Sequence, residues 1–133
     1  MTTTTLNKNV VTVVASSSNA AGATTRGTVD LRTALGGTLT MKITNGATGP
    51  SAQCQCNILI AHNEGSTPAV ASAGVDWKTL WSFGGGTTSN ATTEQSFDIP
   101  QGAMHLEVEF TSNTGQAVTV EAVLSKITSA TTA

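Results

Sequence analysis

Apolar and polar residues alternate along most of this chain, and that alternation constrains the fold more than any other feature. In AMHLEVEFT (residues 103–111) every second residue is apolar, namely Met104, Leu106, Val108 and Phe110. GTLTMKITN (37–45) and AVTVEAVLSKIT (117–128) repeat the pattern. Successive side chains of a β-strand point to opposite faces, so a period of two predicts strands with one apolar face. Helical periodicity is nearly absent, and we expect an all-β fold.

Turn residues separate the alternating stretches. They are Asn45-Gly46, Thr48-Gly49-Pro50, Asn63-Glu64-Gly65, Pro100-Gln101-Gly102 and Asn113-Thr114-Gly115. The predicted strands, about eight in number, lie near residues 9–15, 28–33, 37–45, 53–62, 75–83, 95–99, 103–111 and 117–128. Short strands bounded by turns, each with one apolar face, favour an antiparallel β-sandwich. Its topology is either a jelly roll or immunoglobulin-like.

The composition indicates one small domain with a neutral polar surface. The chain has 133 residues, of which 25 are Thr and only 11% are charged, against about 25% in ordinary globular domains. Thr favours strands because its β-branch suits a pleated surface. We expect loops at residues 16–27, 64–74 and 84–93, the last Gly-rich and mobile. The ends, residues 1–5 and 129–133, read as flexible polar tails.

The charge pattern argues against nucleic acid and membrane partners. The net charge is −2, and the six Lys and Arg residues are scattered without forming a basic stripe that could neutralise phosphates. The first ten residues, MTTTTLNKNV, lack the basic and apolar regions of a signal peptide. The apolar run VVTVVA is far too short to cross a bilayer. We expect a soluble protein made in the cytoplasm.

The stretch CQCNILIAH (54–62) could be a metal site, a redox pair or a strand. On a strand Cys54 and Cys56 share the apolar row, whereas His62 has the opposite parity. Neighbours two apart in an extended strand lie about 6.5–7 Å apart, at the limit for a disulfide, and a zinc site needs four ligands. We therefore expect two buried, reduced thiols in a core strand, with no metal and no cofactor.

No constellation in the sequence predicts catalysis. Glu107 and Glu109 share a strand face, as a pair of acid and base carboxylates would, and His105 lies on the same polar face. On an exposed strand they are better explained as solubilising charges that discourage edge pairing. GGGTT (84–88) lacks the Gly-Lys-Ser/Thr ending of a phosphate loop. The chain is therefore expected not to be an enzyme.

Two tryptophans are the candidate binding residues. Trp77 and Trp81 are four apart on one predicted strand, which places them on the same face. One interpretation is that they anchor the core. The other is that they form a flat platform for a sugar ring or a partner subunit.

Three segments resemble the virion structural proteins of tailed bacteriophages, in composition and strand order. They are TVDLRTALGGTLTMKITNGATGP (28–50), VDWKTLWSFGGG (75–86) and FDIPQGAMHLEVEFTSNTGQAVTVEAVLSKIT (97–128). The resemblance implies a capsid decoration, or cement, protein in the virion that binds the major capsid protein and copies of itself as a homo-oligomer. A tail or head-fibre component is the second possibility that it implies. A sugar-binding phage adhesin remains the main alternative, and no binding residue is carried over from the family.

Overall fold

The computed structural model describes residues 2–68 and 76–133, and its described residues form an all-β fold. The strands are β1 (Thr4–Asn19), β2 (Thr25–Asp30), β3 (Gly37–Asn45), β4 (Gln55–Ala61), β5 (Lys78–Gly84), β6 (Thr92–Ile99), β7 (His105–Thr111) and β8 (Val118–Thr132). The predicted number and order of strands are thereby confirmed. The described part of the chain has no helix that is long and apolar enough to cross a membrane.

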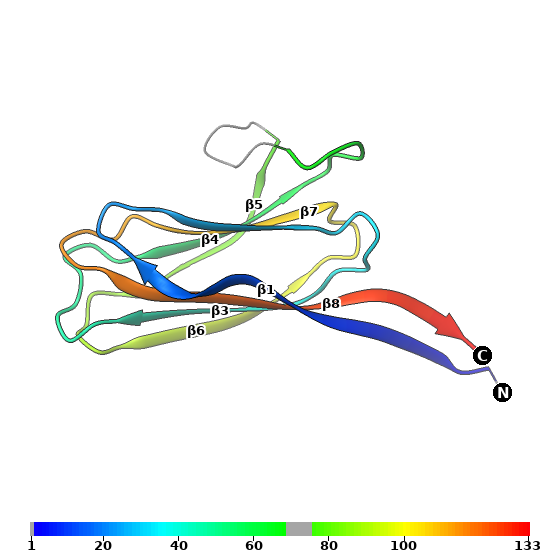
Figure 1. Ribbon diagram of the computed structural model, residues 1–133, viewed down its shortest axis with the longest axis horizontal. Coiled ribbons are helices and arrows are strands. Elements are labelled where there is room, and N and C mark those ends of the chain that lie inside the picture. Colours follow the sequence, from blue (N-terminus) through cyan, green and yellow to red (C-terminus); the bar gives the residue numbers. More distant parts are fainter. Residues whose placement is uncertain (1, 69–75) are drawn as a thin grey trace.

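The strands build two antiparallel sheets packed face to face (Figure 1). One sheet has the order β1-β8-β3-β6 and the other β2-β7-β4-β5. Strands pair from the outside of the sequence inward: β1 with β8, β2 with β7, β3 with β6, and β4 with β5. An immunoglobulin-like sandwich would instead pair its first two strands. The nested pairing is that of a jelly roll, which resolves the alternative that the sequence left open.

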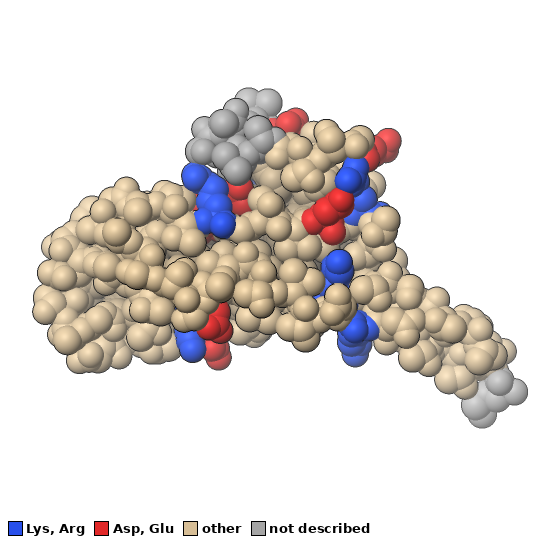
Figure 2. Space-filling view, viewed as in Figure 1, with Lys and Arg blue, Asp and Glu red and all other residues tan. Residues whose placement is uncertain are grey.

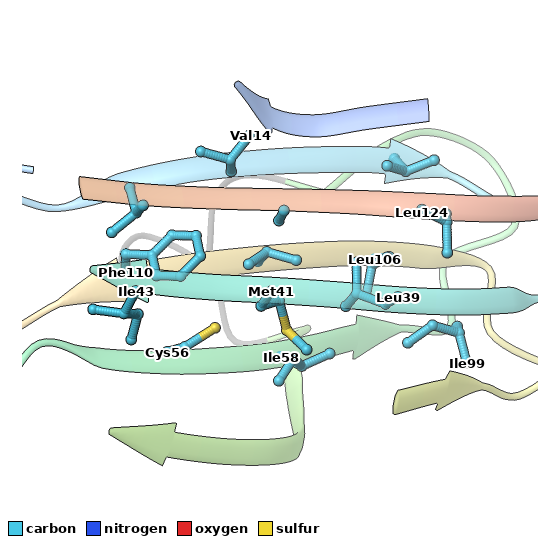
Figure 3. Packing of buried hydrophobic residues seen from close by; sticks show 14 of the residues in the cluster. Val14, Leu39, Met41, Ile43, Cys56, Ile58, Ile99, Leu106, Phe110 and Leu124 are labelled. Carbon is cyan, nitrogen blue, oxygen red and sulfur yellow. The ribbon is translucent and has the colours of Figure 1, made fainter. Parts of the chain in front are cut away.

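Apolar residues from both sheets fill the space between them (Figure 3). On β3, Leu39, Met41 and Ile43 are fully buried, and the residues between them are not. Facing them from β7 are Leu106 and Phe110, which are also fully buried. The period-two alternation therefore predicted the inner face correctly, because each inward position of a sandwich strand contacts the opposite sheet.

The segment 16–27 is mostly strand, which corrects the expected loop. β1 continues through Ser17 and Ser18 to Asn19, where β8 supplies pairing partners, and β2 begins at Thr25. Small polar residues remain in a strand here because the neighbouring strand satisfies their backbone groups. Only the short turn at residues 20–24 separates the two strands.

The Gly-rich connection between β5 and β6 is held by one buried side chain. Asn45 Nδ2 lies within hydrogen-bonding distance of the carbonyl oxygens of Gly85, Gly86 and Thr88, at 3.3, 3.2 and 2.9 Å. The connection is a loop, as expected, but these contacts anchor it to the end of β3. The expected loop at 64–74 is described only up to residue 68, so the rest of that prediction lies outside the described residues.

Candidate functional site

The two ends of the chain form a β-ribbon that extends beyond the sandwich. β3 pairs with β8 no further than Lys126, whereas β1 and β8 continue to pair with each other as far as Thr4 and Thr132. We call residues 4–9 and 126–132 the terminal arm. Figure 1 shows it projecting from the body of the molecule, with both termini at its tip.

The terminal arm corrects the expectation of flexible tails. The described residues of both ends are exposed, as predicted, but they are hydrogen-bonded to each other. Thr3 and Ala133 exchange two backbone hydrogen bonds, of 3.2 and 2.9 Å, at the tip of the arm. The signal was present in the sequence, because runs of Thr at both ends have a high strand propensity. What the sequence could not show is that the two ends pair.

Two of the three exposed large hydrophobic residues in the described ranges lie on the arm or at its base. Leu6 and Val10 are 49% and 67% exposed, and Trp81 is the only other large hydrophobic residue in the described ranges that is exposed. Lys8 lies between Leu6 and Val10 on the same face of β1, since alternate residues share a face. Between Lys8 or Lys126 and the tip, no described residue has a charged side chain, and this part of the arm is tan in Figure 2.

A series of polar side-chain contacts crosses the outer face of the sheet β2-β7-β4-β5. Arg26 on β2 forms an ion pair of 3.0 Å with Glu109 on β7. Asn57 on β4 donates a 2.9 Å hydrogen bond to the other carboxylate oxygen of Glu109. Ser82 on β5 in turn donates to Asn57 Oδ1 at 2.8 Å. Glu109 therefore stabilises cross-strand contacts on a central strand, and it is not the edge charge that the sequence suggested.

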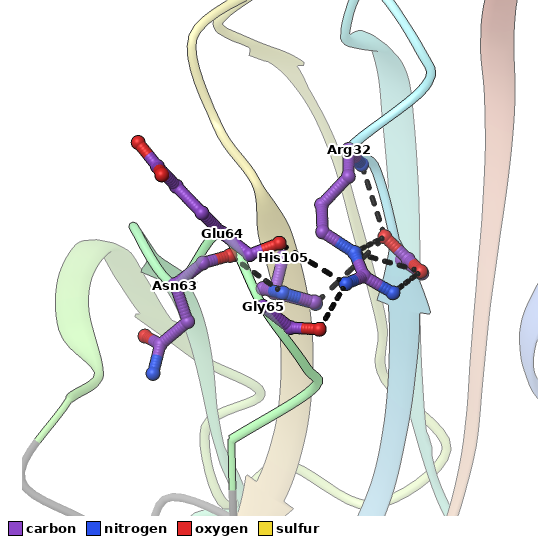
Figure 4. A network of polar contacts seen from close by, with 6 residues as sticks. Arg32, Asn63, Glu64, Gly65 and His105 are labelled. Atoms are coloured by element: carbon purple, nitrogen blue, oxygen red, sulfur yellow. Dashed lines mark hydrogen bonds and ion pairs between the residues drawn. The ribbon is translucent and has the colours of Figure 1, made fainter.

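Asp30 and Arg32 form an ion pair at the end of β2 (Figure 4). The guanidinium lies 2.7 Å from one carboxylate oxygen of Asp30, and its Nη1 donates to the carbonyl oxygens of Glu64 and Gly65 at 3.2 and 2.8 Å. The Arg32 hydrogen bonds hold the pKa of Asp30 well below its usual range. This pair therefore fastens the segment that follows β4 onto the edge of the sheet.

His105 and Glu107 are buried, which contradicts the expected exposed polar face. Both side chains are 0% exposed. His105 Nε2 lies 3.1 Å from the carbonyl oxygen of Asn63, and its Nδ1 lies 4.0 Å from Asp30 Oδ1. The physical reason is that β7 is a central strand whose outer face is covered at this end by the segment after β4. Alternation reveals which face is polar, but it does not reveal whether a loop covers that face.

These groups do not surround a cavity. The described residues form no pocket, and the carboxylates of Asp30 and Glu109 are each paired with a guanidinium group. Their contacts hold strands and one loop segment together. The expectation that the chain has no enzymatic activity and no cofactor stays a prediction.

Cys54 and Cys56 are fully buried free thiols, as the strand parity predicted. Burial raises the pKa of the Cys54 thiol to about 11, and it raises the pKa of Cys56 further. Among the described residues no three His, Cys, Asp or Glu side chains are grouped so that they could hold a metal ion.

The two tryptophans do not share a face. Trp81 pairs with Ile58 and Thr79 pairs with Leu59, so Leu80 is an extra residue in a β-bulge. Trp77 is 8% exposed and lies outside the core cluster, whereas Trp81 is 45% exposed. The placement of both indoles on one face, as the unbroken alternation suggested, is therefore wrong, whereas binding by either tryptophan stays a prediction.

Trp81 bridges the edges of the two sheets. Its ring stacks on Phe97 of β6, with centroids 5.6 Å apart and an interplanar angle of 20°. Its Nε1 donates a 3.2 Å hydrogen bond to Gln95 Oε1. Of the predicted platform residues, only Trp81 is exposed, and its ring stacks on the partly buried Phe97 beside an amide.

No protein-family model matches the chain, and no curated protein matches it. Solved structures do match it. The K3 adhesin domain of Lys-gingipain from Porphyromonas gingivalis W83 has a TM-score of 0.59 and 13% identity over 83% of this chain and 72% of that one. The K1 adhesin domain of the same protein has a TM-score of 0.57 and 11% identity over 97% of this chain and 99% of that one.

A viral protein shares the fold as well. A chain of the T13 viral particle of infectious bursal disease virus has a TM-score of 0.51 and 10% identity. The match covers 95% of this chain but only 34% of the viral one. At these identities the likeness shows the fold alone, which adhesin domains and a viral particle protein have in common.

Proposed function

We propose that this protein is a non-enzymatic structural protein of a bacteriophage virion. It decorates the capsid by binding the major capsid protein and further copies of itself, after synthesis in the host cytoplasm. The observation that carries the proposal is the terminal arm. The resemblance of residues 28–50, 75–86 and 97–128 to phage virion proteins supplies the kind of particle.

The arm is better suited to a partner than to the isolated chain. A two-stranded ribbon is at best marginally stable in water, and beyond Lys126 the only ladder partner of β8 is β1. Leu6 is exposed on this ribbon, and Val10 is exposed at its base. Burying them against a neighbouring protein would stabilise both the arm and the assembly.

The surface and the fold support the same role. With 11% charged residues, the surface offers Thr, Ser and Asn groups that can hydrogen-bond across an interface without the large desolvation penalty of charges. Jelly rolls occur in viral capsid proteins, and the match to a chain of a viral particle is consistent with that use. The same fold occurs in lectins, so the fold by itself does not select between the two roles.

Binding to capsids tests the proposal. Purified protein is mixed with phage heads that lack it, and the heads are sedimented. We expect saturation at a fixed ratio to the major capsid protein, and loss of binding in Leu6→Asp/Val10→Asp. Thr119→Asp, an exposed change on the same sheet far from the arm, should bind normally. Failure of the unmodified protein to sediment with heads would contradict the proposal, as would a gene position among tail-fibre genes.

The second candidate function is that of a sugar-binding phage adhesin, and the exposed Trp81 ring, stacked on Phe97, favours it. Sugar rings bind well to flat aromatic faces. A shift of tryptophan fluorescence on adding oligosaccharide, lost in Trp81→Ala, would support this function. Unchanged fluorescence across a panel of oligosaccharides would count against it.

A further inference from the structure

The two edge strands of the sheet β1-β8-β3-β6 are β1 and β6. Residues 4–10 of β1 are all exposed. From Val13 onward β1 lies against β2, because a Cβ on Gly27 would overlap the carbonyl oxygen of Val13. At the other edge, β6 is largely exposed along its length. A free strand edge presents unpaired backbone groups that can pair with another chain.

The strand directions allow the two edges to join in successive copies. Neighbouring strands in this sheet are antiparallel throughout, so β1 and β6 run in opposite directions. A second copy placed beside the first in the same orientation therefore brings its β1 antiparallel to β6. The new ladder is of the same kind as the three within the sheet, and it keeps the inner and outer faces aligned.

The two edges also carry opposite charges on one face. Lys8 is the only charged residue of β1, and Glu94 and Asp98 are the only charged residues of β6. Val10 pairs with Ser125, which pairs with Thr38, which pairs with Asp98. Directly paired residues share a face, so Lys8, two residues from Val10, lies on the same outer face as Asp98 and Glu94.

We propose that β1 of one copy adds to β6 of the next, with Lys8 opposite Glu94. This register pairs residues 4–10 of β1 with residues 92–98 of β6 and places Leu6 opposite Ser96. The inference deepens the proposed function by assigning the contact between copies, and it rests on that function only for its setting in a virion. The contact itself forms without a capsid.

Charge favours this head-to-tail contact over a symmetric one. Pairing β1 with a second β1 would bring two copies of Lys8 together, and pairing β6 with β6 would oppose four carboxylates. Like charges opposite one another destabilise a strand pair. A head-to-tail contact extends from copy to copy, and it closes into a ring when the rotation between copies permits.

Charge exchange tests the contact in solution. Sedimentation velocity should show concentration-dependent oligomers of the unmodified protein. Lys8→Glu alone and Glu94→Lys/Asp98→Lys alone should each weaken association about tenfold. Each contact uses one β1 and one β6, so mixing the two variants restores opposite charges at every contact and should restore assembly. Glu64→Lys, a change of two charge units at an exposed loop position, should have no effect.

A cysteine pair tests the register. Leu6→Cys combined with Ser96→Cys should form disulfides between copies and give a ladder of trimers and larger species on a non-reducing gel. The native cysteines are buried and should not interfere. A ladder that stops at dimers would overturn the head-to-tail arrangement, as would a failure of the mixed variants to assemble.

Two further outcomes separate this contact from the proposed function. A protein that stays monomeric at all concentrations would overturn the contact and would mean that Lys8, Glu94 and Asp98 protect free edges against pairing. Oligomers that follow the charge exchange but do not bind phage heads would uphold the contact and contradict the capsid role. Monomers that bind phage heads would overturn the contact between copies and uphold the capsid role.

Discussion

Nδ2 of Asn19 lies 2.6 Å from Oδ1 of Asn113, although 94 residues separate them in the sequence. Both side chains are buried, at the end of the sandwich away from the terminal arm (Figure 1). Asn113 Nδ2 also lies within 3.1 Å of the carbonyl oxygens of Asn19 and Gln116. One amide pair thus joins the turn after β1 to the turn after β7.

We expect Asn113→Ala to lower the free energy of unfolding by about 2–4 kcal/mol, because it leaves several buried polar groups without partners. Urea denaturation followed by circular dichroism measures the change. The matched control is Asn7→Ala, which removes an exposed amide bonded to Ser129 and Thr131 and should change stability by less than about 0.5 kcal/mol. Equal effects of the two substitutions would contradict the role assigned to Asn113.

The strands of this fold could be predicted from the sequence, but their pairing could not. Alternation in residues 37–45 and 103–111 identifies the inner face of each strand, because the polarity of a residue depends on whether that residue itself faces the core. The pairing of Thr4 with Thr132 joins opposite ends of the chain, and nothing in either segment identifies the other. The extension of β1 and β8 into an arm depends on that pairing, which is why the ends read as tails.

The two thiols should be unreactive in the folded protein. Because burial raises the pKa of Cys54 to about 11, only about one thiol in a thousand is ionised at pH 8, and Cys56 is shifted further in the same direction. We expect no alkylation of either residue by iodoacetamide at pH 8, and complete alkylation of both in concentrated urea. Leu6→Cys provides an exposed thiol as the positive control. Rapid native labelling of Cys54 or Cys56 would contradict their burial.

Asp30 should contribute stability above about pH 4 that is lost in acid. Its pKa in the folded state is lowered by Arg32, whereas an unfolded Asp has a pKa of about 3.9. Above that value the carboxylate is ionised in both states and the contribution is complete. As the pH falls below about 4, the unfolded state binds the proton first, so the contribution decreases toward the folded-state pKa.

Thermal unfolding of Asp30→Asn tests this linkage. The variant should have a lower Tm than the unmodified protein at pH 7, by a few degrees at most because the pair is partly exposed. The difference should shrink between about pH 4 and pH 2. Arg32→Gln, which removes the guanidinium, should give the same pH profile. A difference in Tm that does not change with pH would exclude the ion pair as its cause.

Gly27 should tolerate no side chain. A Cβ at this position would overlap the carbonyl oxygen of Val13 where β1 lies against β2, so one backbone would have to move. We expect Gly27→Ala to lower the free energy of unfolding by about 1–3 kcal/mol. Gly102→Ala is the control, since a Cβ there would have open space around it. A neutral Gly27→Ala would show that β1 and β2 can separate without loss.

The exposure of the polar face of β7 could not be predicted from the sequence. Alternation correctly identified His105 and Glu107 as lying on the face opposite Leu106, but both are buried. Their burial depends on contacts such as that between His105 and Asn63, 42 residues away. A pattern of period two carries no information about a covering loop. The ion pair between Asp30 and Arg32 was not predicted either, although the two residues are only two apart in the sequence.

The two tryptophans should report different environments. Trp77 is 8% exposed and Trp81 is 45% exposed, because the bulge at Leu80 interrupts the alternation between them. In Trp81→Phe only Trp77 remains, and its emission should be blue-shifted and resistant to quenching by acrylamide. In Trp77→Phe only Trp81 remains, and its emission should lie at longer wavelength and be quenched readily. Both variants keep an aromatic ring, which limits the structural change. If the two single-tryptophan proteins had the same emission maximum and the same quenching, the bulge would not separate the indoles, and a shared aromatic platform would again be tenable.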